Sequence, residues 1–254
     1  MQTIQQSVRT GLMRPFRKFG LAAARHWPWP VGVRISNGRR MYVDLRSGVS
    51  RGIFAKGEFD PKVFEPLRGV LQPGGTFLDV GANVGFYSML ALDAVGLGGA
   101  VHAFEMDERP RRCLRKTIAH ERIPNLSLHE FAVGNRDGHI GVAMHADSGN
   151  SGVVQTGGQR QIAMRKLDTW WHESGAKKIQ GMKLDIEGAE LLALQGAERM
   201  LRAERPLIVC EADEELQGRF GYEPKQLLDQ FAALHYRVEP LAGTWSPTMV
   251  AYPA

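Results

Sequence analysis

The sequence predicts an α/β fold in which a mainly parallel sheet is covered by helices on both faces and is preceded by a basic N-terminal extension. Short apolar runs typical of buried strands alternate with longer segments whose apolar residues recur at helical spacing. This alternation indicates parallel strands joined by helical crossovers. The composition, with 254 residues of which 43% are hydrophobic and 23% charged, is that of an ordinary globular domain.

The positive charge of the chain is concentrated at its start. Residues 1–51 contain ten Lys or Arg and one acid, a balance of +9, whereas the remainder sums to −4. Apolar residues at helical spacing in residues 1–26 predict a basic amphipathic helix. It could lie on the inner membrane surface or on another anionic partner, and a solvated arm is the alternative. The predicted division is an extension over 1–60 and the main domain over 61–254.

The second part of this extension has the pattern of a β-hairpin. The segment Trp27-Pro28-Trp29-Pro30 breaks any preceding helix. From Val31 to Leu45 apolar and polar residues alternate around Asn37-Gly38, a favoured two-residue hairpin turn.

Strand and helix patterns then alternate to the end of the chain. The strand-like segments are residues 76–80, 100–104, 126–133, 140–145, 160–167, 179–186, 207–211, 236–240 and 249–252. The helix-like segments are residues 61–71, 85–95, 109–122, 188–202 and 224–234. No apolar run reaches the roughly 20 residues that span a bilayer.

The two cysteines, Cys113 and Cys210, lie in apolar stretches and show no zinc-type spacing. The N-terminus has no long apolar stretch of the secretory type. We therefore expect a cytoplasmic protein with free, buried thiols.

The turn after the first strand of the main domain predicts a ligand site. It reads Asp79-Val-Gly81-Ala-Asn83-Val-Gly85. Gly81 permits a tight turn and a close approach of a ligand to the backbone, and Gly85 allows the following helix to pack against the strand. Asp79 is positioned to accept hydrogen bonds from a ligand. In a parallel sheet, ligands bind at the carboxyl ends of the strands.

A second acid makes this site more specific. Glu105 ends the next strand, where a carboxylate can accept both hydroxyls of a ribose; a helix-capping or solvated acid is the alternative. A dinucleotide prefers Gly-x-Gly-x-x-Gly, whose helix N-terminus receives a pyrophosphate. Asp79 before the turn suits instead the cationic, amine-bearing half of S-adenosyl-L-methionine (SAM). The predicted cofactor is therefore SAM.

Four segments together resemble the FkbM family of SAM-dependent methyltransferases. They are residues 77–88, 101–105, Leu167-Asp-Thr-Trp170 and Met182-Lys-Leu-Asp-Ile-Glu-Gly-Ala-Glu190, and the match covers roughly residues 55–215. The resemblance implies a Rossmann-like class I methyltransferase fold with a seven-stranded sheet, and O-methylation of a hydroxyl. Family substrates include sugar residues of glycans and glycolipids, and polyketide natural products. The chain departs from the family at Phe59-Asp60, where Tyr-Glu is frequent, and at Met106, where proline is frequent.

The resemblance also implies where the adenine of SAM would rest. In this fold the adenine lies after the third strand, which here places it at Ala132 and Val133, followed by Gly134. Asn135 or a neighbouring backbone group could read the adenine edge.

Methyl transfer to a hydroxyl requires alignment of the acceptor and usually a general base. Asp185 follows a buried strand, and we predict it to be the base or an acceptor-orienting group, with Glu187 as its partner. The alternative is that Glu187 and Glu190 favour the N-terminus of the next helix. Glu211 ends the following strand and is a candidate substrate contact. Asp185 and Glu211 could hold a divalent cation, but carboxylates without histidine spacing do not lead us to expect a metal.

His145 is a further catalytic candidate. It precedes a segment rich in Gly, Ser, Asp and Asn (146–152) that could fold over the acceptor, and an exposed loop histidine is the alternative.

Two other functions remain open. The basic extension also suits a methyltransferase acting on protein or nucleic acid, although the acidic candidate residues disfavour a polyanionic partner and the chain has no Pro-Pro pair. The second open function is that of a non-catalytic SAM-binding protein. The expected partner is a small-molecule or glycan hydroxyl acceptor.

Overall fold

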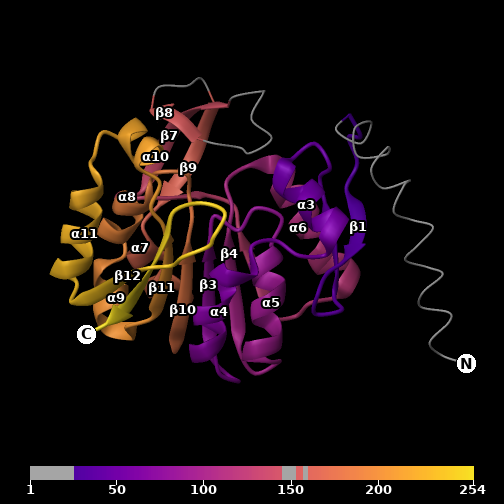
Figure 1. Ribbon diagram of the computed structural model, residues 1–254, viewed down its shortest axis with the longest axis horizontal. Helices are drawn as coiled ribbons and strands as arrows, with labels where there is room; N and C mark the ends of the chain where they lie inside the picture. Colours follow the sequence, from indigo (N-terminus) through magenta and orange to yellow (C-terminus); the bar gives the residue numbers. More distant parts are fainter. Residues whose placement is uncertain (1–25, 145–152, 157–159) are drawn as a thin grey trace, which may run out of the picture.

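A computed structural model describes residues 26–144, 153–156 and 160–254 of the chain. A central seven-stranded sheet has the order β12-β13-β11-β10-β3-β4-β5 (Figure 1). Its strands are β3 Thr76–Val80, β4 Ala100–Phe104, β5 Leu126–His129, β10 Ile179–Leu184, β11 Leu207–Glu211, β12 Tyr236–Pro240 and β13 Thr248–Pro253. Only β13 runs antiparallel to its neighbours, β11 and β12, within this sheet. The predicted seven-stranded, mainly parallel sheet is confirmed.

Two apolar cores lie on the two faces of this sheet. Neighbouring strand residues contribute to opposite cores: Phe77 belongs to one and Leu78 to the other. The same holds for Val209 and Ile208 on β11. Alternate strand residues point to opposite faces, so a strand buried on both sides is apolar along its length. This explains the continuous apolar runs in the sequence.

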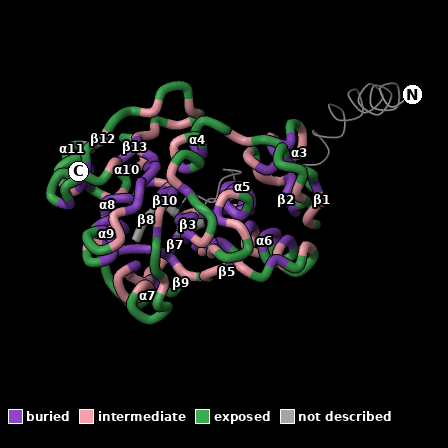
Figure 2. The backbone as a smooth tube through the Cα atoms, turned by 90° about the horizontal axis from the view of Figure 1, so that it is seen from below, coloured by how far each residue is buried: buried purple, intermediate pink, exposed green. Residues whose placement is uncertain are grey.

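Helices cover both faces of the sheet. The first core packs against α4 Pro61–Val70, α5 Phe86–Val95 and α6 Glu108–Glu121. The second packs against α7 Leu167–Ser174, α8 Glu190–Gln195, α9 Glu198–Glu204 and α11 Pro224–Ala233. In Figure 2 buried strands occupy the centre, and the outer turns of the helices carry the exposed residues.

The predicted hairpin is confirmed. Strands β1 Val31–Arg34 and β2 Arg40–Val43 pair antiparallel, with Gly38 in the left-handed region (φ +84°). The hairpin packs on α6, where Tyr42 N donates to Thr117 Oγ1 (2.9 Å). Together with α3 Gly48–Lys56 it adds apolar side chains to the first core. The division at residue 60 stays a prediction, and most of the predicted helix over 1–26 lies outside the described residues.

A smaller second sheet corrects one predicted strand. It has the order β6-β9-β7-β8, with β6 Ala132–Val133, β7 Gly138–Met144, β8 Val153–Thr156 and β9 Arg160–Arg165. The predicted strand over 126–133 is therefore wrong as a single element. After His129 the chain leaves the central sheet, and Ala132 pairs with Met164 of β9. Apolar periodicity continues through this change of sheet and does not reveal it.

Other predicted boundaries shift for local reasons. The helix expected over 188–202 is two helices, because the chain bends at Gly196, where a Cβ would lie 2.0 Å from Gly134 O. The strand predicted over 160–167 ends at Arg165, since Leu167 begins α7. Three further helices were not predicted from the sequence, namely α3, α7 and α10 Glu214–Arg219.

Candidate active site

A cavity of about 370 Å³ lies at the carboxyl ends of β3, β4, β10 and β11. Predicted site residues that line it are Gly81, Asn83, Glu105, Ala132, Val133, Asp185, Glu187 and Glu211. The structure thus brings together residues that are far apart in the sequence. His145 lies outside the described residues, and its predicted role stays a prediction.

The turn after β3 requires a glycine at position 81. Gly81 has φ +80°, and a Cβ there would lie 1.8 Å from Asp185 O. Its N–H and that of Ala82 both donate to Phe104 O at 3.0 Å. The turn is therefore held between β4 and the end of β10, with no room for a side chain.

Gly85 acts through helix packing, as expected, but against a different neighbour. It has φ +85°, and a Cβ would lie 2.5 Å from Leu114 Cδ1. The glycine thus lets the start of α5 approach α6 rather than the strand, and among the cavity-lining residues Gly85 does not appear.

Glu105 presents a carboxylate to the cavity. Its Oε2 accepts from Asn83 N (2.8 Å) and its Oε1 accepts from Asp107 N (2.7 Å). Burial raises the pKa of Glu105 to about 7, although these backbone hydrogen bonds oppose the shift. An ionised carboxylate has about four acceptor sites, so each oxygen can accept a further hydroxyl. This arrangement suits a diol such as a ribose.

Asp79 is placed differently from the expectation. It is fully buried and is not among the cavity-lining residues. Its Oδ2 accepts from Ser88 N (2.9 Å) and Ser88 Oγ (2.5 Å). Its Oδ1 lies 3.8 Å from Lys183 Nζ. The position does not support direct contact with a ligand; the carboxylate acts within the protein.

Lys183 also lines the cavity and was not predicted from the sequence. It is 4% exposed, and its Nζ donates to Gly81 O (3.0 Å) and lies 3.1 Å from Asp185 Oδ2. Burial alone would lower its pKa, but the carboxylates of Asp185 and Asp79 outweigh burial and raise the pKa of Lys183. Lys183 therefore ties the turn after β3 to the predicted base. The sequence did offer a signal for this residue: a lysine inside an apolar strand predicts nearby partners, because a buried charge needs them.

The ends of β10 and β11 hold two carboxyl groups in unusual surroundings. Glu187 lies in the left-handed region (φ +59°), and burial together with Asp185 raises its pKa. Glu211 is 9% exposed, and its Oε2 has no hydrogen-bond partner among the described residues. Burial and the nearby acids, Asp185 foremost, raise the pKa of Glu211 to about 9. This raised pKa favours the protonated form of Glu211, which can donate a hydrogen bond.

Glu190, in contrast, shapes the turn before α8. It is 1% exposed, and its Oε1 accepts from Ile186 N (2.9 Å) and Gly188 N (3.2 Å). Tyr222 donates to the other oxygen at 3.4 Å. These contacts agree with the alternative given above for Glu190, in which it stabilises the N-terminus of the next helix.

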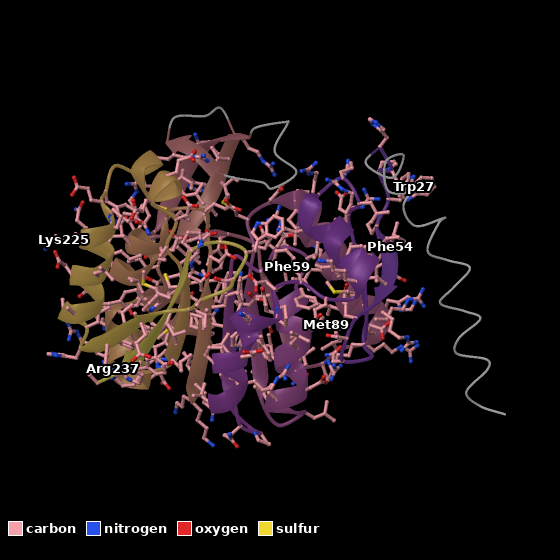
Figure 3. The ribbon with its side chains drawn as sticks, in the orientation of Figure 1. Trp27, Phe54, Phe59, Met89, Lys225 and Arg237 are labelled. Carbon is pink, nitrogen blue, oxygen red and sulfur yellow. The ribbon has the colours of Figure 1, made fainter. Side chains whose placement is uncertain are left out.

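The mouth of the cavity includes an aromatic pair that was not predicted. The loop between β12 and β13 brings Trp245, 84% exposed, to Phe59, with ring centroids 6.3 Å apart. Trp245 N donates to Asp60 Oδ2, so Asp60 anchors this loop. Both aromatic residues line the cavity, and Figure 3 labels Phe59 in the middle of the molecule.

Within the described parts of the chain, no group of three or more His, Cys, Asp or Glu side chains is arranged to hold a metal ion. The possible Asp185–Glu211 cation site therefore gains no support. None of the helices in these same parts is long and apolar enough to cross a membrane.

Comparison with known proteins identifies the family. The model of the FkbM methyltransferase domain matches residues 79–238, and the chain belongs to this family. It is 24% identical over 189 residues to 2-O-methyltransferase NoeI of Sinorhizobium fredii, covering 64% of this chain and 76% of that protein.

Two solved structures share the fold. A methyltransferase FkbM from Methylobacillus flagellatus has a TM-score of 0.53 at 19% identity, over 80% of this chain. The chain spans about half of that protein's length (52%). A precorrin-6y C5,15-methyltransferase from Geobacter metallireducens has a TM-score of 0.50 at 12% identity, over 84% of this chain and 97% of the other.

Proposed function

We propose that this chain is a SAM-dependent O-methyltransferase that transfers a methyl group to a hydroxyl of a sugar, a glycan or a polyketide-type natural product. The observation that carries the proposal is the shared cavity: Glu105 faces it from the end of β4, and Asp185, Glu187 and Glu211 face it from β10 and β11. One half suits a nucleoside and the other suits a hydroxyl acceptor.

The residues of the first half fit SAM. The Glu105 carboxylate retains acceptor sites for the ribose hydroxyls, and the turn at Gly81 lets a ligand approach the backbone. The buried residues Ala132, Val133 and Met164 give an apolar wall where the resemblance places the adenine. Bound there, SAM would supply an electrophilic methyl group on a sulfonium.

The second half supplies the acceptor chemistry. With SAM bound, Asp185 would take the proton of the acceptor hydroxyl, whose oxygen would receive the methyl group. Lys183 holds the Asp185 carboxylate in place through their 3.1 Å contact. Neutral Glu211 donates a hydrogen bond to a second oxygen of the acceptor and so helps to align it. The name of the relative NoeI, a 2-O-methyltransferase, supports a hydroxyl as the acceptor.

The direct test is transfer of labelled methyl from SAM into a panel of sugars, glycolipids and polyketides. We expect labelling of a hydroxyl-bearing acceptor by the native chain and strongly reduced labelling by Asp185→Asn. Calorimetry with SAM and with NAD checks the cofactor separately. Binding of NAD but not of SAM would refute the assignment. Labelling of only protein or nucleic acid, or SAM binding without any turnover, would favour one of the two alternative functions.

A further inference from the structure

Two exposed tryptophans lie at the end of the molecule formed by the hairpin, α3 and α6. Trp27 is 52% exposed and Trp29 is 57% exposed, and each is followed by a proline that restricts the backbone. Figure 3 labels Trp27 at this end. Large aromatic residues exposed in a cluster usually mark an interaction surface.

Helix α6 carries two stripes of basic residues with different surroundings. Arg111 and Arg115, four residues apart, both pair with Glu108 and Glu130. Arg112 and Lys116, also four residues apart, form the neighbouring stripe. Arg112 stacks on Trp29 (4.8 Å from the ring centroid) and Lys116 lies over Tyr42 (4.3 Å).

Arg40 of the hairpin adds a third cation to the second stripe. Its guanidinium lies 5.8 Å from the same Tyr42 ring. Within the described residues, no carboxylate forms an ion pair with Arg40, Arg112 or Lys116. Three exposed cations thus share one surface with two exposed indoles, and no ion pair with a described residue neutralises them.

We propose that this surface, formed by Trp27, Trp29, Arg40, Arg112 and Lys116 and called here the tryptophan–arginine surface, docks on a bilayer rich in anionic phospholipid. Indole rings prefer the level of the lipid headgroups, and arginine and lysine are attracted to anionic headgroups. The sequence before residue 26 adds five Lys or Arg and no acid, which extends the same charge complementarity. The proposal is independent of methyl transfer.

Co-sedimentation of the full chain with vesicles tests it. We expect binding to phosphatidylcholine vesicles that contain phosphatidylglycerol, weak binding to phosphatidylcholine alone, and weaker binding as salt increases. Each cation near an anionic surface contributes roughly fivefold to affinity, so Arg112→Gln with Lys116→Gln should lower affinity roughly 25-fold. Trp27→Ala with Trp29→Ala should also lower it.

The matched control is Lys225→Gln with Arg237→Gln, which removes the same charge at the opposite end of the molecule (Figure 3). This control should bind vesicles like the native chain, and thermal unfolding checks that every variant folds. Equal binding with and without phosphatidylglycerol would overturn the proposal. So would binding that Arg112→Gln with Lys116→Gln leaves unchanged, or that the control lowers equally. Retention on duplex RNA without vesicle binding would overturn it in favour of a nucleic-acid partner.

Discussion

The two halves of the cavity differ in how their polar groups are satisfied. On the cofactor side, both oxygens of Glu105 accept hydrogen bonds from backbone N–H groups, and the turn at Gly81 is fixed by the neighbouring strand. On the acceptor side, an oxygen of Glu211 lacks a partner among the described residues and Glu187 has a strained backbone. Buried polar groups normally find partners, and strained residues cluster at functional sites. The comparison indicates that the protein alone holds both oxygens of Glu105, whereas Glu211 keeps an oxygen that a ligand can bind.

Lys183 joins these two halves. It binds the carbonyl of Gly81 on one side and the carboxylate of Asp185 on the other, and Asp79 lies behind it. We therefore expect variants in the half of the cavity around Glu105 to change mainly cofactor binding, and variants in the half around Asp185 to change mainly turnover. Variants of Lys183 should change both.

The largest expected effect is on turnover, from Asp185→Asn. The amide keeps the shape of the side chain but cannot take the proton of the acceptor, and a positioned base typically contributes 10²–10⁴-fold. We therefore expect kcat to fall by roughly 10²–10⁴-fold while calorimetry shows unchanged affinity for S-adenosylhomocysteine. Glu187→Gln is the companion variant and should have a smaller effect. Unchanged kcat in Asp185→Asn would remove Asp185 from the mechanism.

Lys183→Met should affect both halves of the cavity. It leaves the buried carboxylate of Asp79 without its cation, and removing one partner of a buried ion pair costs about 3–5 kcal/mol. Urea unfolding should show a loss of this order, together with weaker cofactor binding. The double variant Asp79→Asn with Lys183→Met removes both charges and should recover part of the stability. No recovery in the double variant would show that the ion pair is not the cause.

The sequence was sufficient to predict the central sheet and the positions of Gly81 and Glu105 at its edge, for a physical reason. Strands buried on both faces give apolar runs, and the glycines of the turn after β3 are required by the local backbone. Gly81 and Glu105 follow their strands directly, so their positions depend on local structure. Both therefore line the cavity, and their part in cofactor binding stays a prediction.

The parts that the sequence could not predict depend on contacts distant along the chain. Trp245 reaches the cavity through Asp60, 185 residues away in sequence, and Lys183 contacts Gly81, 102 residues away, and the neighbouring Asp79. The direction in which Asp79 points is set by a polar contact nearer in sequence, with Ser88 nine residues later on the following helix. Apolar periodicity carries no information about such pairings.

On the cofactor side, affinity should depend on pH through Glu105. Its pKa of about 7 in the free protein means that the ionised form, which we propose as the acceptor of the ribose hydroxyls, is the main form only above pH 7. Binding favours that form, so affinity for S-adenosylhomocysteine should fall about tenfold between pH 8 and pH 6. Calorimetry at several pH values measures this, and Glu105→Gln should bind more weakly with a flatter profile. An identical pH profile in the variant would exclude Glu105 as the titrating group.

On the acceptor side, the smallest expected effect is a change in the pH dependence of stability. The ordinary pKa of a glutamate, 4.5, applies in the unfolded chain, whereas the pKa of Glu211 in the folded protein is about 9. Between these values the folded state binds more protons than the unfolded chain, so stability falls as pH rises through this range. Glu211→Gln removes this dependence and should unfold at higher urea concentration than the native chain at pH 8. If the variant also loses turnover of its acceptor, the protein retains a destabilising acid for the sake of its substrate, as expected for a functional site. A stability gain without any loss of turnover would instead leave Glu211 without a part in acceptor binding.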